Sequence, residues 1–217
     1  MREEMEKRNR EMVSMLKHRG VIKSETVERA FLSVPRHLFV PEEYASYAYE
    51  DVPLPTLKGQ TISQPSIVAL MLEELDLKPR HRVLEIGAGS GWNAALIAHI
   101  VKPGRVITIE IDRDVAEFAR RNIRKTNLDN VTIVEGDGSL GYEAEAPYDR
   151  IAVTAACERV PEPLFRQLKE GGKLIAPVGS VYSQMLTLFE KRGKIRAREI
   201  LPCIFVPLRG KYGLKQF

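Results

Sequence analysis

A glycine-rich turn is the segment of this sequence best suited to holding a small molecule. The apolar run Val83–Ile86 leads into a turn with glycines at Gly87, Gly89 and Gly91, and a mostly apolar stretch, 93–101, follows. Glycines between a strand and a helix let the backbone bend tightly, and they let a ligand approach the main-chain N–H groups at the positive end of the helix. We therefore expect this turn to form a ligand-binding loop.

The spacing of these glycines argues against a nicotinamide dinucleotide. Such a site uses the pattern G-x-G-x-x-G, which would place its third glycine at position 92. That position is Trp92, and the third glycine comes one residue earlier, at Gly91. Glu85, at the end of the preceding strand, suits a ligand with an ammonium group better than one with phosphates. A nucleotide-binding dehydrogenase or a non-catalytic module is therefore the most distant alternative, which NAD binding would support.

Two more acidic residues stand where apolar runs end. Glu110 follows the run Val106–Ile109, and Asp137 and Gly138 come after the run Val131–Val134. Glu110 lies about twenty residues beyond the glycines, the spacing at which an acidic side chain accepts hydrogen bonds from ribose hydroxyls. Because open α/β sheets bind ligands where such strand ends meet, we interpret the acidic strand ends together as a site for an adenosine-bearing ligand.

Ser63 allows two interpretations. It precedes an expected helix with Pro65 in its first turn and an apolar stripe behind it. An N-cap serine would stabilise that helix by about 1 kcal/mol, and spacing alone favours this role. Alternatively, the hydroxyl would orient an acceptor carboxylate at the positive N-terminus of the helix. Both roles are compatible with each other.

Several segments together resemble one enzyme family. The strand and glycine loop, with an acid at the next strand end, resemble the class I S-adenosylmethionine-dependent methyltransferases. Further segments narrow the resemblance to the protein-L-isoaspartate (D-aspartate) O-methyltransferases along nearly the whole chain: Val34–Pro41, Gly59–Pro65, Gly136–Gly138, Ala146–Asp149, Pro177–Gly179 and Phe205–Leu208. The stretch from Gln60 to Pro65 is the most specific, since general methyltransferases have no counterpart to it. Glu85 is a conservative departure, because Asp also occurs there in the family.

The resemblance implies a reaction and a set of residues. A methyl group would pass from S-adenosyl-L-methionine to the free α-carboxylate of L-isoaspartyl residues in damaged proteins, leaving S-adenosyl-L-homocysteine. The ester would then collapse to a succinimide, which initiates repair. By this resemblance the cofactor-binding residues are Glu85, Gly87, Gly89, Glu110, Asp137 and Gly138. Thr61, Ile62, Ser63 and Val206 would line the substrate cleft, with Ser63 as the catalytic residue.

The expected chemistry needs no general base. A carboxylate is already a nucleophile at neutral pH, and no His or Cys dyad stands in these motifs. Proximity and alignment alone can supply about 7–11 kcal/mol. Removal of water from the carboxylate would raise its reactivity further.

The basic residues of the chain are concentrated near its end. The net charge is +4, and the residues from Lys191 onward include eight Lys or Arg against the single acid Glu199. Basic side chains on an exposed strand hinder pairing with other chains, which is the simpler interpretation. An anion-attracting rim is the alternative. It favours the nearer rival function, a class I methyltransferase acting on RNA or a small molecule, whose nucleic-acid affinity would fall steeply with salt.

The elements that must position these residues alternate along the chain. Helices are expected to about Arg19, from Ser24 to Val34, and over 64–76, 91–101, 114–126 and 161–169, with Asp112 or Asp114 as a cap. Strands are expected at Val83–Ile86, Val106–Ile109, Val131–Val134, Ile151–Val153, Leu174–Ala176, Met185–Phe189 and Ile195–Val206. Short apolar strands between helices predict an α/β fold with a doubly wound, mostly parallel Rossmann-like sheet. An antiparallel end and an N-terminal helical and loop extension complete it.

Length and composition set the outer limits. At 217 residues we expect a single methyltransferase domain: a substrate-cleft extension over 1–62, a cofactor-binding core over 63–180 and antiparallel strands over 181–217. There is no run of about 18 apolar residues and no apolar signal-peptide core. The two cysteines, Cys157 and Cys203, and four scattered histidines predict neither a disulfide nor a metal site. We therefore expect a cytoplasmic monomer with no nucleic-acid or membrane partner.

Overall fold

A seven-stranded sheet forms the centre of the molecule. The computed structural model describes residues 2–214 and gives the strand order β5-β4-β3-β6-β7-β8-β9. Neighbouring strands from β5 to β7 are parallel, whereas β8 and β9 run antiparallel at the end of the sheet. The strands are β3 (Arg82–Ile86), β4 (Arg105–Glu110), β5 (Val131–Glu135), β6 (Tyr148–Val153), β7 (Leu168–Gly179), β8 (Gln184–Arg192) and β9 (Lys194–Cys203). The predicted fold class, including its antiparallel end, is confirmed.

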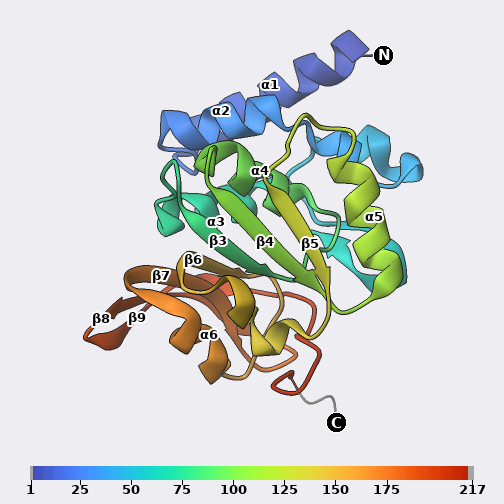
Figure 1. Cartoon of the computed structure of the whole chain (residues 1–217). Helices are drawn as coiled ribbons and strands as arrows, with labels where there is room; N and C mark the ends of the chain where they lie inside the picture. The colour runs from blue at the N-terminus through green and yellow to red at the C-terminus, as the bar shows by residue number, and fades with distance from the viewer. Residues whose placement is uncertain (1, 215–217) are drawn as a thin grey trace.

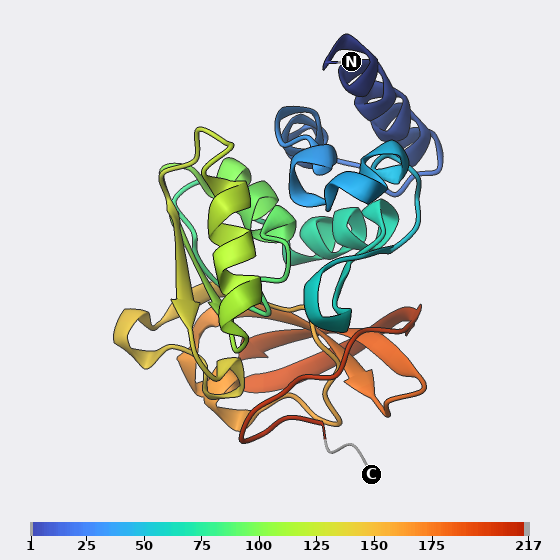
Figure 2. The ribbon, with the colours of Figure 1, turned by 90° about the vertical axis from the view of Figure 1, so that its right-hand side faces the viewer.

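Helices cover both faces of this sheet (Figures 1 and 2). They are α1 (Arg2–His18), α2 (Glu25–Ser33), α3 (Pro65–Leu75), α4 (Trp92–Val101), α5 (Arg113–Ile123) and α6 (Glu162–Gln167). One hydrophobic cluster joins α1–α4 to one face of the sheet, and a second cluster joins α6 to the other. None of the helices in residues 2–214 combines the length and apolar composition needed to cross a bilayer.

The alternation of side chains along the central strands decides which of them face α4. In β3, Val83 belongs to the cluster of α3 and α4, whereas Leu84 and Ile86 belong to the cluster of α6. Because successive side chains of a strand point to opposite faces, Glu85 points toward α4. Thr108 pairs with Glu85 in the parallel register of β3 and β4. A two-residue period thus places Glu85, Thr108 and Glu110 on one face.

The N-terminal extension combines the two helices α1 and α2 with an irregular segment over 35–62, as predicted. Ser24 caps α2, its side chain accepting from the amide of Val27. Three 3-10 turns follow at Arg36–Phe39, Glu42–Tyr47 and Leu57–Gly59, and the short strands β1 (Leu54–Pro55) and β2 (Thr61–Ile62) pair antiparallel. In both views this extension, coloured blue to teal, lies on the side of α3 and α4, away from α6 (Figures 1 and 2).

Several predicted boundaries are corrected. The helix predicted over 161–169 ends at Gln167, because the chain enters β7 at Leu168. The strand predicted at Leu174–Ala176 is twelve residues long, since β7 pairs with β6 on one side and with β8 on the other. The last strand ends at Cys203 rather than Val206. Lys215, part of the basic C-terminal segment, lies outside the described residues.

The interpretation of Ser63 as an N-cap is wrong. The N-cap of α3 is Gln64, and the carboxylate of Asp51 accepts from the Ser66 amide in the first turn of this helix. The Trp92 ring packs against the N-terminal extension. It meets Phe31 of α2 edge to face, and its Nε1–H donates to the Val34 carbonyl at 3.1 Å. By contrast Asp112 caps α5, as proposed.

Candidate active site

A cleft opens at the carboxyl ends of β3, β4 and β6. It encloses about 840 Å³ of space, part of which is open to solvent. Its walls come from segments far apart in sequence: 60–63, 85–90, 92–93, 109–111, Gly138, 154–155 and 205–209. Since β3 and β6 are the strands at which the chain order reverses, the cleft lies at the topological switch point of the sheet.

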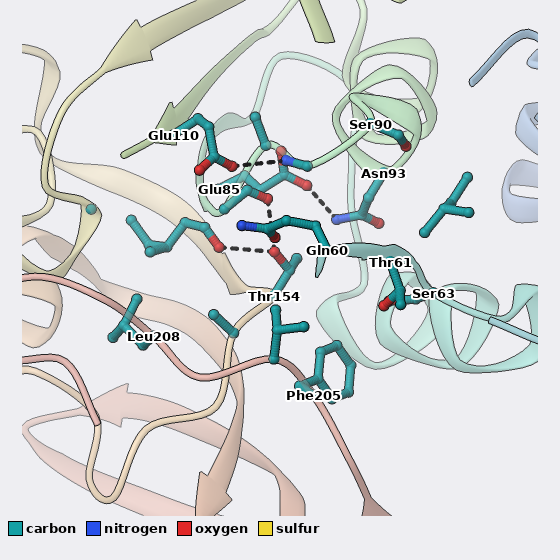
Figure 3. Close-up of a pocket in the computed structure, with 18 of the residues that line it drawn as sticks. Gln60, Thr61, Ser63, Glu85, Ser90, Asn93, Glu110, Thr154, Phe205 and Leu208 are labelled. Atoms are coloured by element: carbon teal, nitrogen blue, oxygen red, sulfur yellow. Dashed lines mark hydrogen bonds between the residues drawn. The ribbon is translucent and has the colours of Figure 1, made fainter. Parts of the chain in front are cut away.

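Glu85 is the most deeply buried acid of the cleft. It has no exposed surface, and burial, reinforced by the nearby Glu110 charge, raises its pKa to about 7. Asn93 Nδ2 donates to Oε1 at 2.7 Å (Figure 3). The Thr108 hydroxyl donates to Oε2 at 2.5 Å. These two hydrogen bonds favour the charged form and oppose the desolvation penalty. A cationic group bound here would favour the carboxylate further.

Glu110 joins the glycine loop to the end of β4. Its Oε2 accepts from the Gly89 amide and its Oε1 from the Asp112 amide, both at 3.1 Å. The side chain is almost fully buried, and Arg209 Nη2 lies 3.9 Å from Oε1. Each carboxylate oxygen can accept a second hydrogen bond, so the pair can still receive two hydroxyl donors.

Two glycines of the cleft pack too closely against neighbouring side chains to carry a Cβ. A Cβ at Gly87, whose φ is +93°, would lie 2.6 Å from the Thr154 hydroxyl oxygen. A Cβ at Gly138 would lie 2.7 Å from a methyl carbon of Ile86. The Thr154 oxygen is also 2.7 Å from the Gly87 carbonyl, which ties β6 to the loop. Close packing of this loop against β6 therefore requires a glycine at position 87.

One polar atom in the wall has no protein partner. Asn93 lies in the first turn of α4, and its Nδ2 is used by Glu85. Its Oδ1 is buried without a hydrogen bond among the described residues. An orphaned acceptor beside a buried carboxylate is unfavourable in an empty pocket and suits a ligand that carries N–H donors. These acceptors therefore fit an ammonium-bearing ligand, as Glu85 alone suggested.

A second cleft, about 690 Å³ including open solvent, continues from the first. The two share Thr61, Ser63, Thr154, Phe205 and Val206. The segment before α3 forms one side, and the segment that leaves β9 forms the other (Figure 3). The Ala156 amide donates to the Val206 carbonyl at 2.8 Å, which fixes the second side to the segment that follows β6. Two connected clefts provide adjacent places for two different molecules.

Most of the predicted site residues meet here, and one does not. Thr61, Ile62, Ser63, Glu85, Gly87, Gly89, Glu110, Gly138 and Val206 all line the main cleft. Asp137 is not part of its lining. Its Oδ1 accepts from the amide and hydroxyl of Ser139, and its Oδ2 accepts from the Lys211 amide at 2.7 Å. The carboxylate of Asp137 thus holds a neighbouring loop.

Sequence reasoning missed three residues of the site. Asn93 was available as the polar residue that opens the cofactor helix. Thr154 directly follows the apolar run of β6, so the same strand-end criterion that found Glu110 would have found it. Thr108 carried no signal, because its contact depends on the register between two strands. Among the described residues, no group of His, Cys, Asp and Glu is arranged to hold a metal ion.

Comparisons with known proteins agree on one family. The family model described as protein-L-isoaspartate(D-aspartate) O-methyltransferase matches residues 7–213. A protein-L-isoaspartate O-methyltransferase of Hyperthermus butylicus is 51% identical over 219 residues, covering 96% of this chain and 91% of that one. The relative from Methanopyrus kandleri is 53% identical over 209 residues, covering 94% and 92%.

Solved structures give the same result. One protein-L-isoaspartate O-methyltransferase matches with a TM-score of 0.87 at 37% identity, covering 94% of this chain and 67% of that chain. A Plasmodium falciparum structure named for the same activity, in complex with S-adenosyl-L-homocysteine, matches at 0.83 and 31%, covering 92% and 97%. A precorrin-6y C5,15-methyltransferase from Geobacter metallireducens shares the fold alone, with a TM-score of 0.53 and 19% identity over 69% of this chain and 89% of that one.

Proposed function

The chain belongs to the protein-L-isoaspartate(D-aspartate) O-methyltransferase family, and from that premise we propose which of its residues carry out the reaction. The enzyme transfers a methyl group from S-adenosyl-L-methionine to the free α-carboxylate of L-isoaspartyl residues in proteins. The methyl ester then closes to a succinimide, whose hydrolysis gives the damaged chain a route back to normal aspartate. The observation that carries the assignment of roles is the junction of two clefts at Ser63 and Thr154.

The main cleft suits the cofactor. When bound, S-adenosyl-L-methionine supplies a methyl group on a positively charged sulfur. Glu85 and the orphaned Asn93 Oδ1 would receive the ammonium end, and the free lone pairs of Glu110 would receive the ribose hydroxyls. Gly87, Gly89 and Gly138 line this cleft without a side chain, so the cofactor would lie directly against their backbone. The Asp137 carboxylate would support cofactor binding indirectly, by holding the neighbouring loop, and would not contact the cofactor.

The second cleft suits the acceptor. Thr61, Ile62, Ser63 and Val206 would hold the isoaspartyl residue so that its α-carboxylate enters the junction. That carboxylate is ionised at neutral pH, so the protein needs to orient and desolvate it rather than remove a proton. Among residues 2–214 the Ser63 hydroxyl makes no hydrogen bond, and the side chain is half-buried. A free hydroxyl at this point supports its role as the donor that orients the acceptor.

A matched pair of peptides tests the function. Label from methyl-labelled S-adenosylmethionine should appear as a base-labile ester on a peptide with an L-isoaspartyl linkage. The same sequence with normal aspartate should stay unlabelled. Label on neither peptide, with S-adenosyl-L-homocysteine still bound, would refute the repair function. It would favour RNA or a small molecule as acceptor.

The working state of the enzyme is part of the same proposal. We propose that it acts as a monomeric single domain in the cytoplasm, without a nucleic-acid or membrane partner. Cys157 and Cys203 are both unpaired, which suits a reducing compartment. Light scattering coupled to size exclusion should give a mass near 24.5 kDa, and a dimer mass would contradict the monomer.

A further inference from the structure

Arg36 is the buried charge that the cofactor and acceptor roles leave unexplained. It lies in the first 3-10 turn of the N-terminal extension and has no exposed surface. Burial lowers its pKa to about 10, so the guanidinium is still charged at neutral pH. No carboxylate forms an ion pair with it among the described residues; Asp51 is the acid that acts on it through space. Carbonyl oxygens instead surround the charge.

The two arms of the guanidinium reach two different segments. Nη1 donates to the carbonyls of Ala48 and Glu50 at 2.9 and 3.3 Å. Nη2 donates to Val52 at 3.0 Å, and also to Ile62 at 3.4 Å and Ser63 at 3.1 Å. The first three carbonyls belong to the turn before β1, whereas the last two belong to the segment that lines the acceptor cleft. The Arg36 side chain therefore fixes the backbone at Ser63, the proposed catalytic serine.

The same guanidinium also touches the cofactor side. Its Cζ lies 5.4 Å from the centroid of the Trp92 ring, a cation–π contact. Trp92 is the residue directly after the glycine loop and lines the main cleft. Phe31 and the Val34 carbonyl hold that ring independently of Arg36. The Trp92 ring is thus a fixed surface, and Arg36 sets the position of Ile62 and Ser63 relative to it.

From these contacts we propose, resting on the proposed function, that Arg36 is a positioning residue for methyl transfer. Its planar fork holds the carbonyls of Ile62 and Ser63 at a set distance from Trp92, and so aligns the acceptor carboxylate with the methyl donor. Lysine cannot replace it, because one ammonium cannot span both groups of carbonyls. A misplacement of about 1 Å can reduce the rate of a reaction about a hundredfold. Alignment is therefore the property that this residue controls.

Arg150 offers a matched control. Arg150 is half-buried and, like Arg36, donates to backbone carbonyls: Nε to Leu75 at 2.5 Å, Nη1 to Asp149 at 2.7 Å and Nη2 to Asp76 at 3.3 Å. It lies at the amino end of β6, opposite the site. Arg150→Lys and Arg36→Lys make the same chemical change and remove the same kind of hydrogen bond. Only the second should affect the acceptor segment.

Hydrogen exchange and kinetics together test the proposal. In Arg36→Lys and Arg36→Gln, amides of residues 60–64 should exchange about tenfold faster, because local opening becomes easier. The value of kcat/KM for the isoaspartyl peptide should fall about tenfold or more through loss of alignment. The Kd of S-adenosyl-L-homocysteine, measured by calorimetry, should stay within about twofold of wild type, since Glu85 and Glu110 are not attached to this network. Arg150→Lys should lower the Tm but leave both the exchange of residues 60–64 and kcat/KM unchanged.

The outcomes separate this inference from the function itself. Unchanged exchange at 60–64 in Arg36→Lys, or an equal increase in Arg150→Lys, would overturn the positioning role, and this readout does not depend on activity. Equal loss of peptide and cofactor affinity would also overturn it, because that pattern indicates general loosening. Should Arg36→Gln fail to fold, the comparison of the two lysine variants decides alone. Failure of the repair function would show in the wild type, as absence of label on the isoaspartyl peptide.

Discussion

Ser63 shows how the structure separates two roles that the sequence left together. The residue stands one position before the actual N-cap of α3, and its carbonyl is held by Arg36. Its hydroxyl faces the junction of the two clefts. The helix therefore does not need the hydroxyl, which is left available for the proposed acceptor. The proposed orienting role predicts that activity and stability respond differently to the loss of this hydroxyl.

Ser63→Ala should lower kcat for the isoaspartyl peptide by about tenfold or more, because the carboxylate loses an orienting donor. Its free energy of unfolding should change by less than about 0.5 kcal/mol, the usual range for a side chain without partners. Steady-state kinetics and thermal melts measure the two effects. Ser66→Ala serves as control, since that hydroxyl accepts from Gln64 within the same helix. Equal losses of activity and stability in Ser63→Ala would return the serine to a structural role.

The raised pKa of Glu85 makes the free enzyme's stability depend on pH. Between the ordinary value of 4.5 and about 7 the folded state keeps a proton that the unfolded state has lost. The free energy of unfolding therefore falls as pH rises through this window. Glu85→Gln, which cannot ionise, should match wild type below the ordinary pKa, near pH 4, and exceed it at pH 8 by an amount on the order of 3 kcal/mol. Urea unfolding at the two pH values measures the difference, and a difference independent of pH would contradict the burial argument.

At the scale of elements, strand periodicity explains what could be predicted and what could not. The ends of β3 and β4 were found from sequence because an acid at the end of an apolar run is visible locally, and both Glu85 and Glu110 line the main cleft. The contacts of Arg36 and Trp92 were not predicted, because they join residues separated by many tens of positions. The short length of α6 was also hidden, since it depends on β7 pairing with two neighbours. Local pattern predicts elements, and packing between distant segments decides their limits.

The loop after β5 and the C-terminal segment depend on each other. Asp137 accepts from Ser139 and from the Lys211 amide, and the Tyr212 amide donates to the Ser139 hydroxyl at 3.0 Å. Gly210 lies so close to this carboxylate that an added Cβ would be 1.9 Å from its Oδ1. Upstream in the same segment, Leu208 and Arg209 line the cofactor cleft. Asp137 thus supports one wall of the cleft from behind.

Asp137→Ala should therefore free the C-terminal segment. We expect amides of 208–214 to exchange faster and the Kd of S-adenosyl-L-homocysteine to rise about tenfold, as expected when two or three hydrogen bonds to a charged group are lost. Hydrogen exchange and calorimetry measure these changes. Asp129→Ala is the control, since the exposed Asp129 side chain forms a surface ion pair with Lys102. If cofactor affinity fell while exchange at 208–214 stayed unchanged, the carboxylate would contact the cofactor directly.

At the scale of the whole molecule, the last strand of the sheet carries three of the eight basic residues from Lys191 onward: Lys194, Arg196 and Arg198. β9 pairs with β8 on one side, and its first six residues are exposed. An exposed edge presents unpaired backbone groups that can recruit another chain. Lys194 and Arg196 stand on this edge, opposite Arg192 and Glu190 of β8. Their position favours protection of the edge over attraction of an anion, and the two interpretations predict different losses.

Replacing Lys194 and Arg196 together by threonine should promote self-association, because threonine favours strand pairing and removes the repulsion between edges. Light scattering during heating should rise at a lower temperature than for wild type, while kcat/KM for an isoaspartyl peptide should keep its value and its salt dependence. The pair Arg121→Thr and Arg124→Thr, exposed at the end of α5, removes the same charge from a helix. That control should not associate. An unchanged scattering curve, with a fall in kcat/KM and a loss of salt dependence, would instead make the edge a rim that attracts acidic substrates.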